Sequence, residues 1–136
     1  MLASGTLPVV DASALLEYLL GTDLGLRVGD RLEGERSLDA PDLIDVEVCS
    51  ALRGLERGRA VAAPRVLDAL DDLLEAPLVH YPVRALLPRI WELRAELSAY
   101  DAAYVALAED LRSDLITSDG RLARSRGHRA SVVLIA

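Results

Sequence analysis

The stretch YDAAYVALAEDLRSDLITSDGRLAR, residues 100–124, contains the pattern that decides the fold class. Its first half repeats apolar residues at the spacing of one helical face, and these are Tyr104, Val105, Leu107, Ala108 and Leu111. A short β-like run follows at residues 115–117. One acid, Asp101, heads the helical pattern, and a second, Asp119, follows the predicted strand. Because ligands of parallel α/β sheets bind at the carboxyl ends of strands, we expect both acids at that edge.

The rest of the chain alternates strands and helices in the same way. Strands are expected at residues 7–10, 37–40, 78–81, 114–118 and 132–135. Helices are expected at residues 12–20, 24–34, 42–57, 65–75, 84–97, 101–111 and 121–126. This alternation predicts an α/β fold whose central sheet is mostly parallel, with four to five strands and right-handed crossovers. We expect the 136 residues to form a single domain, residues 1–136, around one core.

The composition favours a cytoplasmic protein. Hydrophobic residues make up 51 % of the chain, yet no apolar run approaches the ~20 residues that a membrane span needs. The N-terminus lacks the basic and apolar regions of a signal peptide. The one cysteine, Cys49, has no partner for an intramolecular disulfide, which fits a reducing cytoplasm. Since Val46 and Leu52 are its helical neighbours, we expect Cys49 to be a core thiol.

The charge pattern excludes several classes of phosphate-handling protein. A net charge of −7 argues against simple non-specific binding of nucleic acid. Dehalogenase-type phosphatases and response-regulator receivers use a Lys near the phosphoryl group, whereas every basic residue of this chain is Arg. The motif DASALL after the first strand also lacks the second acid of the phosphatase DxD motif. The sequence contains no Gly-rich phosphate loop and no GxSxG motif.

Four acids stand out from the remaining ones by their position. Asp11 and Asp119 follow predicted strands, whereas Asp114 lies roughly 15 Å away at the other end of its strand. Glu47 and Asp101 are embedded in apolar helical stripes. An ionised carboxylate in such a stripe costs several kcal/mol unless it is paired or bound to a metal.

Each of these acids also has an ordinary structural interpretation. Asp11, Asp101 and Asp119 could be helix N-caps, and Glu47 could pair with a buried Arg. The set as a whole favours a metal, because four carboxylates at one edge of the sheet would repel one another strongly. Mg²⁺ or Mn²⁺ suits such oxygen ligands. Zinc is not indicated, since the two histidines lack ligand spacing.

Hydroxyl groups accompany the acids. Ser13 lies two residues after Asp11, and Thr117 lies two residues before Asp119. These hydroxyls could make local caps and turns, or they could orient metal-bound carboxylates. A further capping motif is expected where the helix at residues 42–57 begins, with Asp42 as the cap and an acid three residues later bonding back.

Four pieces of the sequence, in this order, resemble the PIN-domain ribonucleases, specifically the VapC-type toxins of bacterial toxin–antitoxin pairs. The pieces are VVDASALL, APDLIDVEVCSALRGLERGR, YDAAYVALAEDL and LITSDGRLAR. The resemblance implies a three-layer α/β/α PIN-like fold in which Asp11, Glu47, Asp101 and Asp119 are the catalytic metal ligands and Thr117 is the hydroxyl before the last acid. Some relatives carry a further acid after this motif, but here Gly120 and Arg121 follow.

The resemblance also implies a function. We expect an endoribonuclease toxin that uses Mg²⁺ or Mn²⁺ to hydrolyse phosphodiester bonds of transfer or ribosomal RNA. Its expected partners are a second copy of the chain, in a homodimer, and a cognate VapB-type antitoxin. Two alternatives remain open: a metal-free module that captures an Arg-bearing peptide in the acidic pocket, and a flap-type DNA nuclease with the same acidic site.

Overall fold

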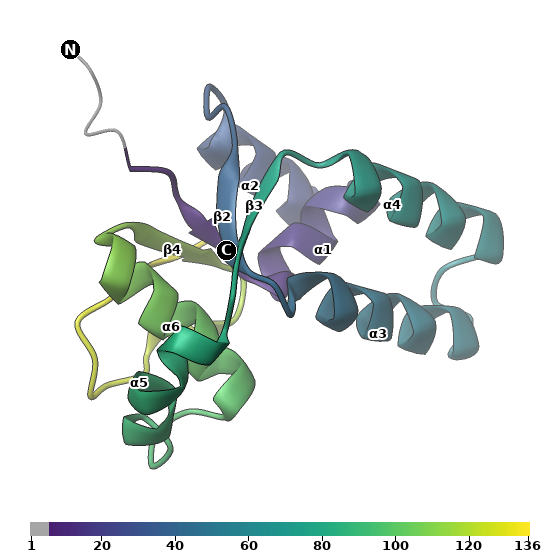
Figure 1. Cartoon of the computed structure of the whole chain (residues 1–136). Helices are drawn as coiled ribbons and strands as arrows, with labels where there is room; N and C mark the ends of the chain where they lie inside the picture. Colours follow the sequence, from purple (N-terminus) through teal and green to yellow (C-terminus); the bar gives the residue numbers. More distant parts are fainter. Residues whose placement is uncertain (1–5) are drawn as a thin grey trace.

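Five strands form one sheet in the order β3-β2-β1-β4-β5 in the computed structural model, which describes residues 6–136 (Figure 1). The strands are β1 (Val9–Val10), β2 (Leu38–Pro41), β3 (Leu78–Tyr81), β4 (Asp114–Thr117) and β5 (Ser131–Leu134). Every neighbouring pair is parallel. The carboxyl ends of all five strands therefore lie at one edge of the sheet, and the expected parallel α/β fold is confirmed.

The helices cover both faces of this sheet. They are α1 (Ala12–Leu20), α2 (Asp23–Leu32), α3 (Ile44–Arg57), α4 (Ala63–Glu75), α5 (Leu87–Glu92), α6 (Ala99–Leu111) and α7 (Gly120–Ala123), with a 3₁₀ turn η1 (Arg84–Leu86). Helix α1 packs with α2, α3 and α4 on one side, and α6 packs with α5 on the other (Figure 1). The expected three layers are confirmed. Within residues 6–136, every helix is too short or too polar to cross a membrane.

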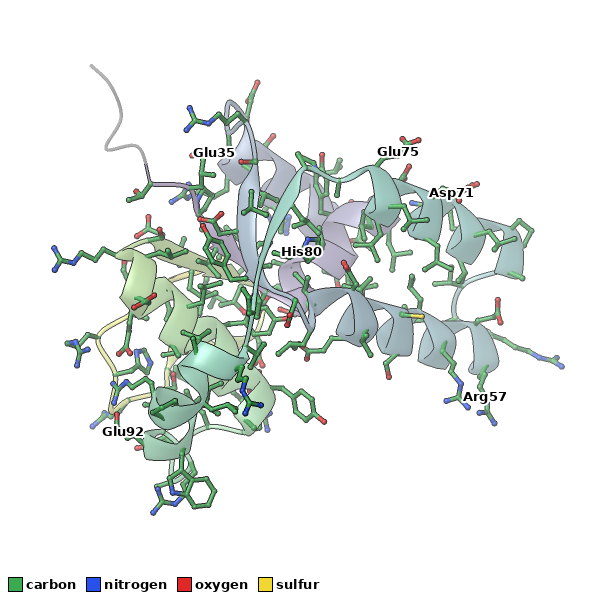
Figure 2. All side chains as sticks on the ribbon, in the orientation of Figure 1. Glu35, Arg57, Asp71, Glu75, His80 and Glu92 are labelled. Carbon is green, nitrogen blue, oxygen red and sulfur yellow. The ribbon has the colours of Figure 1, made fainter. Side chains whose placement is uncertain are left out.

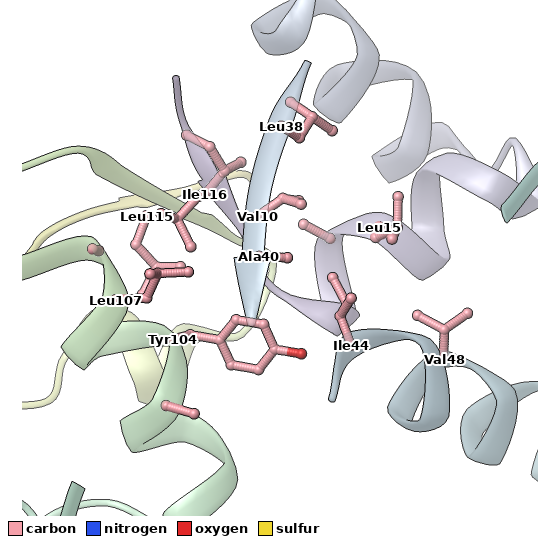
Figure 3. Packing of buried hydrophobic residues seen from close by; sticks show 14 of the residues in the cluster. Val10, Leu15, Leu38, Ala40, Ile44, Val48, Tyr104, Leu107, Leu115 and Ile116 are labelled. Atoms are coloured by element: carbon pink, nitrogen blue, oxygen red, sulfur yellow. The ribbon is translucent and has the colours of Figure 1, made fainter. Parts of the chain in front are cut away.

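Helix α6 is the central element of the core. All residues from Ala102 to Ala108 are buried, because α6 lies between the sheet and α5. Figure 3 shows Leu107 of α6 beside Leu115 of β4, and the ring of Tyr104 directed toward Ile44 of α3. The sequence pattern indicated one apolar face, but a helix covered on two sides is buried nearly all round. Small alanines at several of these positions leave room for the second neighbour.

The expected helix at residues 84–97 is shorter and interrupted. The chain forms the 3₁₀ turn η1 and then α5, which ends at Glu92. Pro88 explains the interruption, because it has no N–H to bond back to Arg84 and fits best in the first turn of a new helix. The prediction was therefore wrong in length but right in placing helical structure here.

Helix α3 corrects two further predictions. Its N-cap is Leu43, and no side chain bonds to the free N–H groups there, so the predicted cap at Asp42 was wrong. The carboxylate of Asp45 pairs instead with His80 Nε2 at 2.9 Å. Cys49 is exposed and not a core thiol. The reason is that the buried stripe of α3 runs through Ile44, Val48 and Leu52, and Cys49 lies off that stripe.

One buried acid escaped the sequence reasoning. Asp39 lies within β2, between β1 and β3, and only 4 % of its surface is exposed. The Tyr81 hydroxyl bonds to its carboxyl group, while Oδ1 has no hydrogen-bond partner. Burial raises the pKa of Asp39 above its ordinary value, and the Tyr81 hydrogen bond only partly opposes this shift. An ionised Asp39 therefore destabilises the fold at neutral pH.

We predict that Asp39→Asn stabilises the protein at neutral pH, by on the order of 1 kcal/mol. A carboxyl group with a raised pKa in the folded state stabilises the fold below its unfolded pKa, and this contribution is lost as the pH rises through the folded pKa. The difference between variant and wild type should therefore be small near pH 4 and grow toward pH 7. Urea unfolding at several pH values measures it. The exposed acid Asp68 provides the control, because Asp68→Asn should show no such trend.

Candidate active site

Asp11 is the centre of a hydrogen-bonded cluster at the carboxyl edge of the sheet. It follows β1 directly, caps α1 and is only 4 % exposed. Its Oδ1 accepts the Ala14 N–H at 2.9 Å and the Ser13 hydroxyl at 2.7 Å. Its Oδ2 accepts the Thr117 hydroxyl at 2.5 Å. Both carboxylate oxygens are therefore held in place by protein donors from two strand ends.

Ser13 and Thr117 connect the end of β1 with the end of β4. Each hydroxyl donates its proton to Asp11. Each also accepts a backbone N–H, since Ser118 donates to Ser13 Oγ at 3.2 Å and Asp119 donates to Thr117 Oγ1 at 3.0 Å. The two hydroxyl oxygens lie 3.3 Å apart, but both protons are already used on Asp11. Ser13 and Thr117 thus fix the carboxylate of Asp11 and the backbone at Ser118 and Asp119.

Asp119 and Asp101 lie close enough for their charges to interact. Asp119 caps α7, and its Oδ1 accepts the Arg121 N–H at 2.9 Å. Asp101 lies in the first turn of α6, whose N-cap is Ser98, so the interpretation of Asp101 as a cap is wrong. Burial raises the pKa of Asp101, and the negative charge of Asp119 raises it further. A hydrogen bond between Ser98 and the Asp101 carboxyl group lowers this pKa in part.

Glu47 reaches the site from α3 and meets a residue that the sequence reasoning did not single out. The Tyr104 hydroxyl donates to Glu47 Oε1 at 2.6 Å. Figure 3 shows this hydroxyl pointing from α6 toward the start of α3. The interpretation that Glu47 pairs with a buried Arg is wrong, because its partner is a neutral phenol. The signal that could have found Tyr104 is its spacing three residues after Asp101, which puts both on one side of α6.

The acids share one electrostatic field. Burial raises the pKa of Asp11, opposed by its hydrogen bonds, and the charge of Asp101 raises it further. Burial also raises the pKa of Glu47, and so do the charges of Asp101 and Asp11. None of the ion pairs found within residues 6–136 involves Asp11, Glu47, Asp101 or Asp119. Four carboxylates from four segments thus repel one another without a cationic partner in direct contact.

The donor set fits a hard divalent cation. It consists of carboxylate oxygens, the ligands that Mg²⁺ and Mn²⁺ prefer, and the mutual repulsion is what such an ion would relieve. In the arrangement described here, no three acidic, His or Cys side chains of residues 6–136 are grouped closely enough to hold an ion. In this arrangement Glu47 accepts a hydrogen bond from Tyr104, whereas Asp11 accepts hydrogen bonds from Thr117 and Ser13.

The chain is similar to known proteins over most of its length. A family model described as PIN domain matches residues 9–127. The chain is 41 % identical over 128 residues to Ribonuclease VapC12 of Mycobacterium tuberculosis, covering 94 % of this chain and 98 % of that protein. It is 45 % identical over 114 residues to Ribonuclease VapC9 of that species, covering 84 % and 87 % respectively. The crystal structure of PAE2754 from Pyrobaculum aerophilum matches with a TM-score of 0.66 and 24 % identity, over 96 % of this chain and 85 % of that chain, and supports the fold alone.

Proposed function

This chain belongs to the PIN-domain family and is a homologue of the VapC ribonucleases, and we propose that it hydrolyses RNA phosphodiester bonds with Mg²⁺ or Mn²⁺ as its cofactor. The observation that supports the proposal is the placement of Asp11, Glu47, Asp101 and Asp119 near one edge of the sheet, where burial and the charge of a neighbouring acid raise the pKa values of Asp11, Glu47 and Asp101. None of these four acids takes part in an ion pair found within residues 6–136, so a divalent cation would neutralise charge that the described side chains leave uncompensated.

Each residue has a role in this proposal. Asp11, Glu47, Asp101 and Asp119 would hold the metal, which would supply a water molecule of lowered pKa and positive charge for the leaving oxygen. Thr117 and Ser13 keep the Asp11 oxygens in a fixed orientation. Tyr104 does the same for Glu47 Oε1 and, being buried, excludes water from that side. The positive charge of the bound cation would offset the negative charge of the four carboxylates, so that an RNA phosphate could approach.

The names of the relatives guide the proposal on substrate and partners. The protein is proposed to be a toxin that cuts transfer or ribosomal RNA in the cytoplasm as a homodimer. A cognate VapB-type antitoxin would neutralise it. The whole of residues 1–136 is proposed to be one PIN domain, of which the family model matches residues 9–127.

The test is cleavage of structured RNA by the purified chain, freed of any antitoxin. With Mn²⁺ it should cut RNA and leave DNA of identical sequence intact, because only RNA has the 2′-hydroxyl, and a chelator should stop the reaction. Cleavage of DNA alone would favour the flap-type nuclease. Binding of an Arg-bearing peptide, with no cleavage of either nucleic acid, would favour the metal-free binding module.

We predict that Mn²⁺ stabilises the protein in the absence of RNA. A ligand that binds only the folded state at about 100 times its Kd adds ~2.7 kcal/mol to the free energy of unfolding. The shift should shrink as the pH falls, because protons compete for carboxylates whose pKa values are raised. Asp11→Asn should remove most of the shift, and Asp68→Asn, on the exposed face of α4, should keep it. Equal shifts in both variants would contradict a metal site at Asp11. Thermal unfolding with and without Mn²⁺ gives the measurement.

A further inference from the structure

The site needs positive charge beside it to bind a polyanion. The chain carries a net charge of −7, and the four carboxylates add a strongly negative field at the point where RNA must bind. Phosphate contacts by Arg and Lys supply much of the affinity of proteins for nucleic acids, and this chain has only Arg for that purpose. The question is therefore which Arg side chains the fold places at the site.

Arg121 is the first candidate. Its backbone N–H bonds to Asp119 Oδ1 at 2.9 Å, so the residue is fixed to one of the four acids. Its positive charge reaches Asp101, where it opposes the pKa shift caused by burial and by Asp119. The side chain is exposed and takes part in none of the ion pairs found within residues 6–136. Arg121 thus carries an available charge beside two proposed metal ligands.

Arg124 is the second candidate, and Gly120 accounts for its position. A Cβ atom built at Gly120 would lie 3.0 Å from Arg124 Nη1. The Arg124 guanidinium is therefore folded back over the backbone directly after Asp119. Gly120 has no positive φ, so glycine is not needed here for the backbone conformation. Its missing side chain instead leaves room for the Arg124 guanidinium. Two arginines, Arg121 in the short helix α7 and Arg124 at its C-cap, thus follow the last acid closely in the chain.

Several other arginines are already neutralised. Arg89 Nε and Nη2 donate to the two carboxylate oxygens of Glu109 at 2.8 and 2.9 Å, and Nη1 donates to Glu92. Arg31 pairs with Asp114 at 3.1 Å. Bidentate pairing of the kind seen at Arg89 uses the donors that a phosphate would need. By contrast, Arg121 and Arg124 take part in none of the ion pairs found within residues 6–136.

We propose that Arg121 and Arg124 bind two successive phosphates of the RNA strand, Arg121 the phosphate nearest the four carboxylates and Arg124 the next one along. The proposal rests on the proposed ribonuclease function and names the residues that would hold its substrate. It follows that these contacts read the RNA backbone and not its bases, so they strengthen binding to all sequences alike.

The test measures RNA binding without cleavage. A fluorescently labelled RNA hairpin is titrated with the full chain carrying Asp11→Asn, in several salt concentrations, alone and with Arg121→Gln or Arg124→Gln added. Each added change should weaken binding about tenfold and reduce the slope of log Kd against log salt by roughly 0.7 to 1. Arg57→Gln is the matched control, because Arg57 is exposed at the far end of α3 (Figure 2) and should leave both quantities unchanged.

A third variant changes geometry without changing charge. Gly120→Ala should displace the Arg124 guanidinium, while the fold tolerates it because the crowded atom is the end of a flexible side chain. Its affinity should fall between that of the Asp11→Asn parent and that of the Arg124→Gln variant. Binding equal to the parent would overturn the assignment of Arg124.

The outcomes separate this inference from the proposed function. If the wild type cleaves RNA, but Arg121→Gln and Arg124→Gln bind like Arg57→Gln, the ribonuclease stands and the phosphate contacts are wrong. If the wild type neither cleaves nor binds RNA, the proposed function fails and takes this inference with it. Loss of affinity in Arg57→Gln as large as in Arg121→Gln would show a diffuse charge effect and would also overturn the proposal.

Discussion

Asp11→Asn is expected to reduce the rate of RNA cleavage by more than about 100-fold. Partners that only orient metal ligands typically contribute 10- to 100-fold, and Asp11 is proposed to contact the metal itself. The substitution removes one negative charge where four meet, so the metal binds more weakly and is less well placed. Initial rates at saturating Mn²⁺, compared with rates at limiting Mn²⁺, separate the loss of metal affinity from the loss of turnover.

The loss should not come from unfolding. Asparagine keeps an oxygen that can accept the Ala14 N–H and the Ser13 hydroxyl, so the cap of α1 remains. Burial raises the pKa of Asp11, which means that its ionised form destabilises the metal-free fold at neutral pH. The variant should therefore unfold at the same or a higher temperature than the wild type when no metal is present. Cleavage that survives the substitution would indicate a contaminating nuclease or a different active site.

Thr117→Val is expected to reduce cleavage 10- to 100-fold, although residue 117 is not itself a metal ligand. Valine has nearly the same shape but no hydroxyl, so Asp11 Oδ2 loses a donor and the Asp119 N–H loses an acceptor. Thr117 is fully buried, and leaving such groups unsatisfied costs about 1–3 kcal/mol of stability. Thermal unfolding and cleavage rates measured on the same preparation give both numbers.

The control for this change is Thr117→Ser, which keeps the hydroxyl and loses only a methyl group. It should recover most of the cleavage rate, because the hydrogen bonds to Asp11 and from Asp119 can re-form. A second check uses the Asp11→Asn background, where Thr117→Val should add little to the loss of activity, since both changes act on one carboxylate. Full additivity of the two losses would contradict the role of Thr117 as a positioning residue for Asp11.

Some parts of the site could be read from the sequence, because they depend on local order along the chain. Asp11 and Asp119 follow short β-like runs, and parallel strands that end at one edge bring such residues together. The interpretation of these two acids as helix caps is correct, since the end of a strand in an α/β fold is usually the start of a helix, while their role as metal ligands stays a proposal. One position can therefore serve both purposes.

Other parts depend on contacts between distant segments. Tyr104 reads as an ordinary core residue of a helix, and only the packing of α6 near α3 brings its hydroxyl to Glu47, 57 positions away in the sequence. Asp39 escaped notice because burial within β2 depends on strands at both sides. The prediction that Cys49 lies in the core is wrong, because packing against the neighbouring elements buries a narrower stripe of α3 than the sequence pattern indicated.

The amino-acid order by itself determined the alternation of strands and helices, the parallel sheet and the four acids, since periodicity and strand ends are local properties. The tertiary structure alone decided which groups hold three of those acids in place: Thr117 and Ser13 at Asp11, Tyr104 at Glu47, and the Arg121 backbone N–H at Asp119. The physical reason is that hydrogen bonds and charges act over a few ångströms in space, whatever the distance along the chain.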